Sequence, residues 1–116
     1  MSDHIIFGNK GEKLALEFLK KLKYTILQTN WRYKKAEIDI IGIDKDILVF
    51  VEVKTRKSDI FCRPEQSIAP RKEELYKNAA ESFLEQYDYT NEIRFDVISI
   101  IMNIKHTEIE HFINAF

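Results

Sequence analysis

Two acidic residues and a lysine near the middle of the chain, Asp39, Glu52 and Lys54, are spaced so that they could act together on one substrate. Residues 37–43 alternate acidic and aliphatic side chains before becoming aliphatic, and residues 47–54 are almost entirely apolar until Glu52. These patterns predict two β-strands joined as a hairpin. Because alternate residues of a strand share a face, Glu52 and Lys54 are expected to point the same way.

The length of the hairpin turn decides whether the two acids meet. A two-residue loop at Lys45 and Asp46, or a four-residue loop over residues 44–47, places Asp39 opposite Glu52, with Cβ atoms roughly 4.5–5.5 Å apart. A three-residue loop would shift the register and separate them. Carboxylates this close repel unless one is protonated or a cation lies between them, and Mg²⁺ prefers such oxygen ligands.

Lys54 would extend this chemistry, because its ammonium group could orient or deprotonate a water molecule and balance phosphate charge. Two acids and a lysine around one ion suit phosphodiester hydrolysis. The simpler alternative is a salt bridge at the strand end, with a lysine that reaches solvent. Residues 48–53 are apolar on both faces, as in a central buried strand, where an unpaired Glu52 would be costly.

Length and composition restrict the other possibilities. A chain of 116 residues, 45% of them hydrophobic, is long enough for one domain over residues 1–116 but not for two. We find no run of about 20 apolar residues and no basic signal-peptide head, so we expect a cytoplasmic protein that does not enter membranes. The single cysteine, Cys62, excludes an intrachain disulfide and a thiolate zinc site.

Charge is distributed unevenly although the net charge is −1. Residues 54–72 hold six basic and two acidic residues, whereas residues 73–116 hold three basic and nine acidic ones. The near-neutral total argues against a protein that coats nucleic acid. The basic segment could still bind a phosphate backbone beside the acidic site through Arg56, Lys57 and Arg63, although charge runs are usually solvated surface.

Two helices are expected around this hairpin. Apolar residues at helical spacing run from about Glu12, just after Gly11, to about residue 23, and a second helix runs from Pro70 to about Tyr87. Glu12 would then lie in a first turn, where the helix dipole favours an acid, but it could also lean towards the sheet. Lys72 falls on the packed side of the second helix and would reach either solvent or the site.

Three further strands are predicted at residues 24–33, 93–101 and 107–113, which gives the order α-β-β-β-α-β-β. This order, with an aspartate and a Glu-x-Lys motif on the hairpin, resembles the PD-(D/E)XK nuclease fold, a mixed sheet flanked by helices. More closely, nearly the whole chain is similar to the YraN family of small bacterial proteins. The motifs that carry this similarity are Gly11-Glu12, Glu37-Ile38-Asp39, Val49 to Arg56, Lys72, Arg94 to Val97 and Asn114-Ala115-Phe116.

The resemblance implies that Asp39 and Glu52 bind Mg²⁺ or Mn²⁺, with the Val53 carbonyl as a candidate further ligand. It implies that Lys54 activates or positions water and that Glu12 completes the acidic site, as in members similar to Holliday-junction resolvases. It also favours a role at the site for Lys72. Glu37 shares the face of Asp39, but the superfamily signature does not require it. Departures from the family pattern are Ile38 in place of the namesake proline, and Ala36 and Cys62 in place of glycines.

These features favour a metal-dependent endonuclease that acts on DNA, with branched DNA in repair or recombination as one substrate class. A symmetric resolvase would be a homodimer. One alternative is a non-catalytic nucleic-acid-binding or accessory module that keeps the fold. The other is a structural protein with a buried salt network of Asp39, Glu52 and Lys54.

Overall fold

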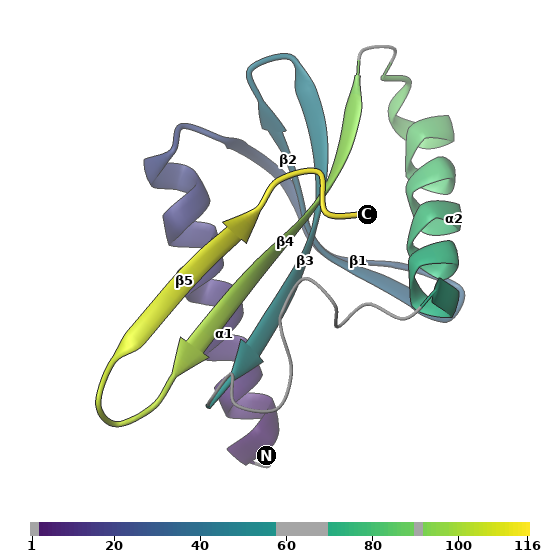
Figure 1. The fold of residues 1–116 in the computed structure, drawn as a ribbon. Coiled ribbons are helices and arrows are strands. Elements are labelled where there is room, and N and C mark those ends of the chain that lie inside the picture. The colour runs from purple at the N-terminus through teal and green to yellow at the C-terminus, as the bar shows by residue number, and fades with distance from the viewer. Residues whose placement is uncertain (1–2, 58–69, 90–91) are drawn as a thin grey trace.

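The computed structural model describes residues 3–57, 70–89 and 92–116 of the chain (Figure 1). Its elements follow the predicted order α-β-β-β-α-β-β, which is confirmed. They are α1 (Asp3–Lys21), β1 (Thr25–Tyr33), β2 (Ala36–Asp44), β3 (Ile47–Arg56), α2 (Pro70–Tyr87), β4 (Ile93–Met102) and β5 (Thr107–Phe112). Over these ranges, neither helix has the length and apolar character needed to cross a membrane.

The five strands form one mixed sheet in the order β1-β2-β3-β4-β5. Neighbouring strands are antiparallel except β3 and β4, which run parallel and have α2 between them in the chain. Figure 1 shows α1 and α2 on opposite sides of this sheet. The fold is therefore the α/β arrangement predicted from the sequence, a sheet flanked by helices.

Strands β2 and β3 are central because their residues supply both hydrophobic cores. Leu48 and Phe50 pack on the α2 side, against residues that include Ala79 and Phe83. Val49 and Val51 face the other way and join the core that contains Ala15 and Leu19 of α1. A strand that is apolar on both faces is thus buried on both faces, as its sequence indicates.

The first helix begins earlier than predicted. We expected it to start near Glu12, just after Gly11, but α1 begins at Asp3 and contains both Gly8 and Gly11. Gly11 is required for packing: a Cβ atom there would lie 1.9 Å from Oγ1 of Thr55 in β3. Glycine lets α1 approach the sheet closely, so Glu12 lies in mid-helix beside β3 and not in a first turn.

The hairpin between β2 and β3 has the two-residue loop that was one of the predicted alternatives. Asp44 pairs with Ile47, and the pairing runs to Ile40 and Val51. Continued by one residue, this register brings Asp39 opposite Glu52.

The ladder between β2 and β3 ends at that point, although both strands continue. Beyond it, Glu37 of β2 pairs with Arg32 of β1, whereas Glu52 of β3 pairs with Val97 of β4. Figure 1 shows β1 and β2 diverging here from β3 and β4. We call this place, with Asp39 on one side and Glu52 on the other, the fork.

Candidate metal centre

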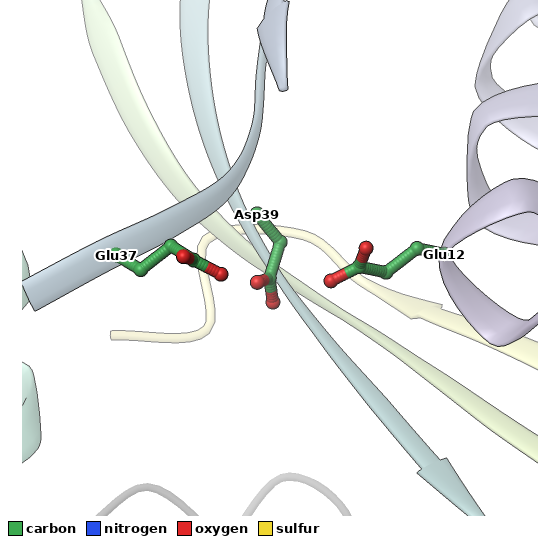
Figure 2. A group of neighbouring side chains, drawn as sticks. All are labelled: Glu12, Glu37 and Asp39. Carbon is green, nitrogen blue, oxygen red and sulfur yellow. The ribbon is translucent and has the colours of Figure 1, made fainter. Parts of the chain in front are cut away.

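Three carboxylates from two distant segments converge at the fork. Glu12 extends from α1, and Glu37 and Asp39 extend from β2, so that one carboxylate oxygen of each lies within 4.8 Å of the others. Figure 2 shows Asp39 between the other two side chains. We call these three residues the acidic group. Carboxylate oxygens are the ligands that hard divalent cations prefer, and these three lie close to the spacing such an ion requires.

A change in strand phase brings Glu37 and Asp39 to the side of α1. Ile38 belongs to the core beneath α2, whereas Ile40 belongs to the core beneath α1, so the regular alternation of side chains breaks between Asp39 and Ile40. On β1, the register places Asn30 opposite this break. Asn30 has a φ of 51°, in the left-handed region that asparagine adopts more readily than most residues.

Among the described residues, the ion pair that reaches the acidic group is that of Arg32 with Glu37, whereas Lys54 and Lys72 pair with Glu52. Burial, followed by the charge of Glu52, raises the pKa of Asp39 to about 8, although the Val53 N–H donates a hydrogen bond of 2.8 Å to Asp39 Oδ2. Burial also raises the pKa of Glu12, and the charges of Glu37 and Glu52 add to the effect. Asp39 therefore favours its neutral form near neutral pH until a cation binds beside it, and for both carboxyl groups the charged form is disfavoured relative to solution.

Glu52, on the other side of the fork, is paired with lysines. Its side chain is buried, and its Oε1 accepts a hydrogen bond of 2.5 Å from Lys72 Nζ and lies 3.8 Å from Lys54 Nζ. Burial and the neighbouring Lys72 lower the pKa of Lys54. Burial would also lower the pKa of Lys72, but the hydrogen bond and charge of Glu52 outweigh it and raise that pKa.

The Tyr76 hydroxyl group joins the two strands where their ladder ends. It donates a hydrogen bond of 2.7 Å to the Val51 carbonyl and accepts one of 3.3 Å from the Asp39 N–H. Burial raises the pKa of this phenol well above its ordinary value, so it stays neutral and keeps its proton for Val51. Tyr76 thus satisfies backbone groups that the parting strands leave without each other.

Comparison with known proteins identifies the family. The family model described as "Uncharacterised protein family UPF0102" matches residues 11–100. The chain belongs to the UPF0102 family. UPF0102 is the YraN family, so the resemblance seen in the sequence is confirmed.

Curated UPF0102 proteins are similar to this chain over most of its length. The protein from Flavobacterium psychrophilum is 46% identical over 116 residues, which cover 100% of this chain and 98% of that protein. One from Caldicellulosiruptor saccharolyticus is 45% identical over 100 residues, 85% of each chain. One from Bacteroides fragilis is 33% identical, over 100% of this chain and 96% of its own. These names state a family and no activity.

The other residues singled out in the sequence, from the family motifs or from the basic segment, lie along β3 and beyond it. Val53 touches the acidic group through its N–H, and a ligand role for its carbonyl stays a prediction. Arg56 ends β3 on the same strand face as Lys54, and the Lys57 carbonyl accepts a hydrogen bond of 3.0 Å from Asn103 Nδ2. Arg63 and Cys62 lie outside the described residues.

Sequence reasoning gave too little weight to four residues of this candidate site. Glu37 was ranked second, yet it belongs to the acidic group as closely as Glu12 does. Its alternation with Asp39 was a usable signal. Asn30, Arg32 and Tyr76 had no signal at the level of spacing, because the first two depend on the β1 register and the third on how α2 packs over the fork.

A second cluster of charges, around Asp96 in β4, is already complete. Its carboxylate is fully buried and accepts two hydrogen bonds of 2.9 Å from Arg94 and one of 3.0 Å from the Asn114 N–H. His111 Nε2 lies 2.7 Å from its Oδ2. Burial would raise the pKa of Asp96, but the bonds from His111, Arg94 and Asn114 outweigh it and lower that pKa.

Proposed function

We propose that the protein is a metal-dependent endonuclease that hydrolyses DNA phosphodiester bonds, with branched DNA as one substrate class. The convergence of Glu12, Glu37 and Asp39 at the fork, with the Glu52-x-Lys54 motif on the opposite strand, is the observation that carries this proposal. Three acids that approach each other beside a largely buried lysine, with Arg32 paired to Glu37 at the outer edge, suit metal-assisted hydrolysis better than a structural role.

The residues present fit Mg²⁺ or Mn²⁺. Ligand oxygens around such ions lie about 3–4 Å apart, so small side-chain movements within the 4.8 Å of the acidic group would hold one. When bound, the ion would supply positive charge to the scissile phosphate and acidity to a water molecule. Glu52 would become available as a further ligand if Lys72 released it.

The lysines would divide two tasks. Lys54 is largely buried, and its lowered pKa makes it able to exchange a proton with an attacking water molecule. Lys72 holds Glu52 in place through their hydrogen bond, and would contribute positive charge near the phosphate. Lys54 is therefore the residue we assign to water, and Lys72 is a positioning residue for Glu52.

Nicking of DNA tests the proposal. Supercoiled, linear, flapped and four-way-junction DNA would be incubated with the wild type and with Asp39→Asn in Mg²⁺, in Mn²⁺ and in EDTA. A matched control is Asp88→Asn, the same chemical change at an exposed position after the far end of α2. We expect metal-dependent cutting by the wild type and by Asp88→Asn, but not by Asp39→Asn. Equal cutting by all three would mean a contaminating nuclease.

Lys54→Ala separates the lysine from the metal ligands. Because Lys54 is outside the acidic group, we expect cutting to fall by about 10²-fold or more while Mn²⁺ binding stays within a few-fold of wild type. Isothermal titration calorimetry would measure the binding. Undiminished cutting would remove Lys54 from the mechanism.

A non-catalytic nucleic-acid-binding module is the second candidate, and the pairing of Glu52 with Lys72 favours it. A protein of this kind would bind the same DNA panel in gel-shift assays without cutting it, and Asp39→Asn would not weaken its binding.

A resolvase would also need two copies of the chain to cut two strands, and light scattering after size-exclusion chromatography would measure that oligomeric state.

A further inference from the structure

Arg32 on β1 connects the acidic group to the surface. Its Nε lies 2.8 Å from Glu37 Oε2 in an ion pair, and the register places the two residues directly opposite each other. The Arg32 side chain is 80% exposed, whereas that of Glu37 is 34% exposed. Glu37 thus holds one edge of a guanidinium group whose remaining surface faces solvent, next to the candidate metal centre.

Its place differs from that of the lysines. Lys54 and Lys72 lie on the β3 side of the fork and contact Glu52, and the Lys54 side chain is only 19% exposed. Arg32 lies on the β1 side and contacts the acidic group itself. A polyanion that approached the acidic group from the β1 side would meet repulsion from the carboxylates and attraction from Arg32.

We propose that Arg32 binds a backbone phosphate of the nucleic acid whose neighbouring phosphodiester lies at the acidic group, with Glu37 as the residue that orients it. The inference rests on the proposed function and names a substrate contact for it. A guanidinium group offers two parallel N–H donors to a phosphate, and the ion pair at Nε restrains the group while 80% of the side chain stays exposed. The contact would recognise phosphate charge and not base sequence.

The alternative is an ordinary exposed salt bridge, which would contribute little to stability or binding. Neutralisation of Arg32 discriminates between them. Arg32→Gln would be compared with Lys20→Gln, which removes the same charge from an exposed position on α1, eight residues beyond Glu12 and so about 12 Å along the helix. Arg32→Lys would keep the charge but lose the paired donors.

Binding is measured separately from cutting, by fluorescence anisotropy of a labelled duplex and a labelled four-way junction in Ca²⁺ and in EDTA, over a series of KCl concentrations. We expect Arg32→Gln to bind about tenfold more weakly, with the slope of log affinity against log salt reduced by about 1. Lys20→Gln should keep the wild-type affinity and slope. Arg32→Lys should keep the slope and lose part of the affinity.

The outcomes separate this inference from the nuclease itself. If Arg32→Gln and Lys20→Gln bind alike, Arg32 is not a phosphate contact, whatever the nicking assay shows. If Arg32→Gln loses affinity and slope but the wild type does not nick DNA, the contact stands and the nuclease proposal fails. A wild type that binds neither DNA overturns the contact. Equal urea midpoints for the wild type and both Gln variants would exclude misfolding as the cause.

Discussion

Asp39 and Asp96 are two aspartates of one sheet whose pKa values move in opposite directions. The Asp39 carboxylate has Glu12, Glu37 and Glu52 as acidic neighbours, and its pKa rises to about 8. Asp96 is more deeply buried, yet its pKa falls below the ordinary value. Burial alone would raise both values, so the neighbours decide the direction.

This difference indicates which of the two aspartates requires a ligand that the protein itself does not supply. Asp96 pairs with the positive charge of Arg94 and accepts hydrogen bonds from Arg94 and from the Asn114 N–H, and His111 Nε2 lies 2.7 Å from its Oδ2. Asp39 receives a backbone N–H from Val53, while the nearest lysines are engaged by Glu52. A buried acid that is fully satisfied is typical of a structural element, and one that is charged only at a cost is typical of a ligand site.

The largest expected effect is on stability, and it should distinguish the two aspartates. Asp96→Asn would remove the closer of the two charge partners of Arg94, whose side chain is 12% exposed, and leave the 3.3 Å pair with Asp44, so we expect the free energy of unfolding to fall by about 3–5 kcal/mol. Asp39→Asn removes a carboxylate that burial disfavours and should leave stability unchanged or increased. Urea denaturation of both variants without metal would measure this.

The opposite result would mean that the two aspartates do not differ in role. If Asp39→Asn lost as much stability as Asp96→Asn, Asp39 would be part of a structural salt network, which is the third interpretation of the sequence. A thermal melt of each variant with Mn²⁺ adds an independent reading. Mn²⁺ should stabilise the wild type and Asp96→Asn, but not Asp39→Asn, because a ligand that binds the folded state raises its stability.

The second prediction concerns pH. The folded pKa of Asp39, about 8, lies above the ordinary value of 3.8, so between these values the folded state holds a proton that the unfolded state has lost. Metal-free wild type should therefore lose stability as the pH rises from about 4 through about 8, and Asp39→Asn should lack this loss. Asp96 has a folded pKa below 3.8, so its contribution is present above about pH 4 and disappears as the pH falls through that folded value.

Metal binding should release the proton that Asp39 holds in the metal-free folded protein. Because Asp39 must ionise to bind Mn²⁺, the affinity should increase with pH up to about 8, and calorimetry in two buffers of different ionisation enthalpy should detect proton release. An affinity independent of pH between about 6 and 8 would contradict the raised pKa of Asp39.

Much of the fold could be predicted from the sequence because the hydrophobic pattern of the central strands largely determines it. Residues 47–54 are apolar on both faces, which indicated a buried central strand, and the Asp44 to Asp46 turn limited the register to a few alternatives. The structure contains the two-residue loop that brings Asp39 opposite Glu52. The start of α1 was predicted wrongly, at Glu12 and not at Asp3, because the close contact of Gly11 with β3 is a tertiary feature that local spacing does not show.

The candidate site was less readable because it depends on contacts between distant segments. Alternation placed Glu37 beside Asp39, but nothing in the spacing showed that Glu12 would meet both, or that Lys72 would bind Glu52. The hydroxyl of Tyr76 and the left-handed backbone of Asn30 are set by tertiary packing and by register. The sequence therefore indicated which residues could form the site, but not which of them would contact one another.

The smallest expected effect tests whether placement of Glu12 separates the two aspartates. Gly11→Ala puts a Cβ atom against Thr55, with contacts of 1.9 Å to Oγ1 and 2.8 Å to Cβ, so α1 must move away from β3. We expect a loss of about 1–3 kcal/mol in the free energy of unfolding, together with weaker Mn²⁺ binding. Gly8→Ala is the matched control, since its Cβ would meet nothing within 4 Å and alanine favours the helix.

Thr55→Ala in the Gly11→Ala background tests whether the contact with the Thr55 side chain is the cause of the loss. It removes Oγ1 and Cγ2 but leaves the Thr55 Cβ position occupied, so it should restore part of the stability and part of the Mn²⁺ affinity. The pKa of Asp96, followed through the acid limb of unfolding, should be the same in all these variants because its partners lie on β4 and in the segment from His111 to Asn114. If Gly11→Ala bound Mn²⁺ as well as Gly8→Ala does, Glu12 would not be needed in the acidic group, and the contrast with Asp96 would rest on Glu37 and Glu52 alone.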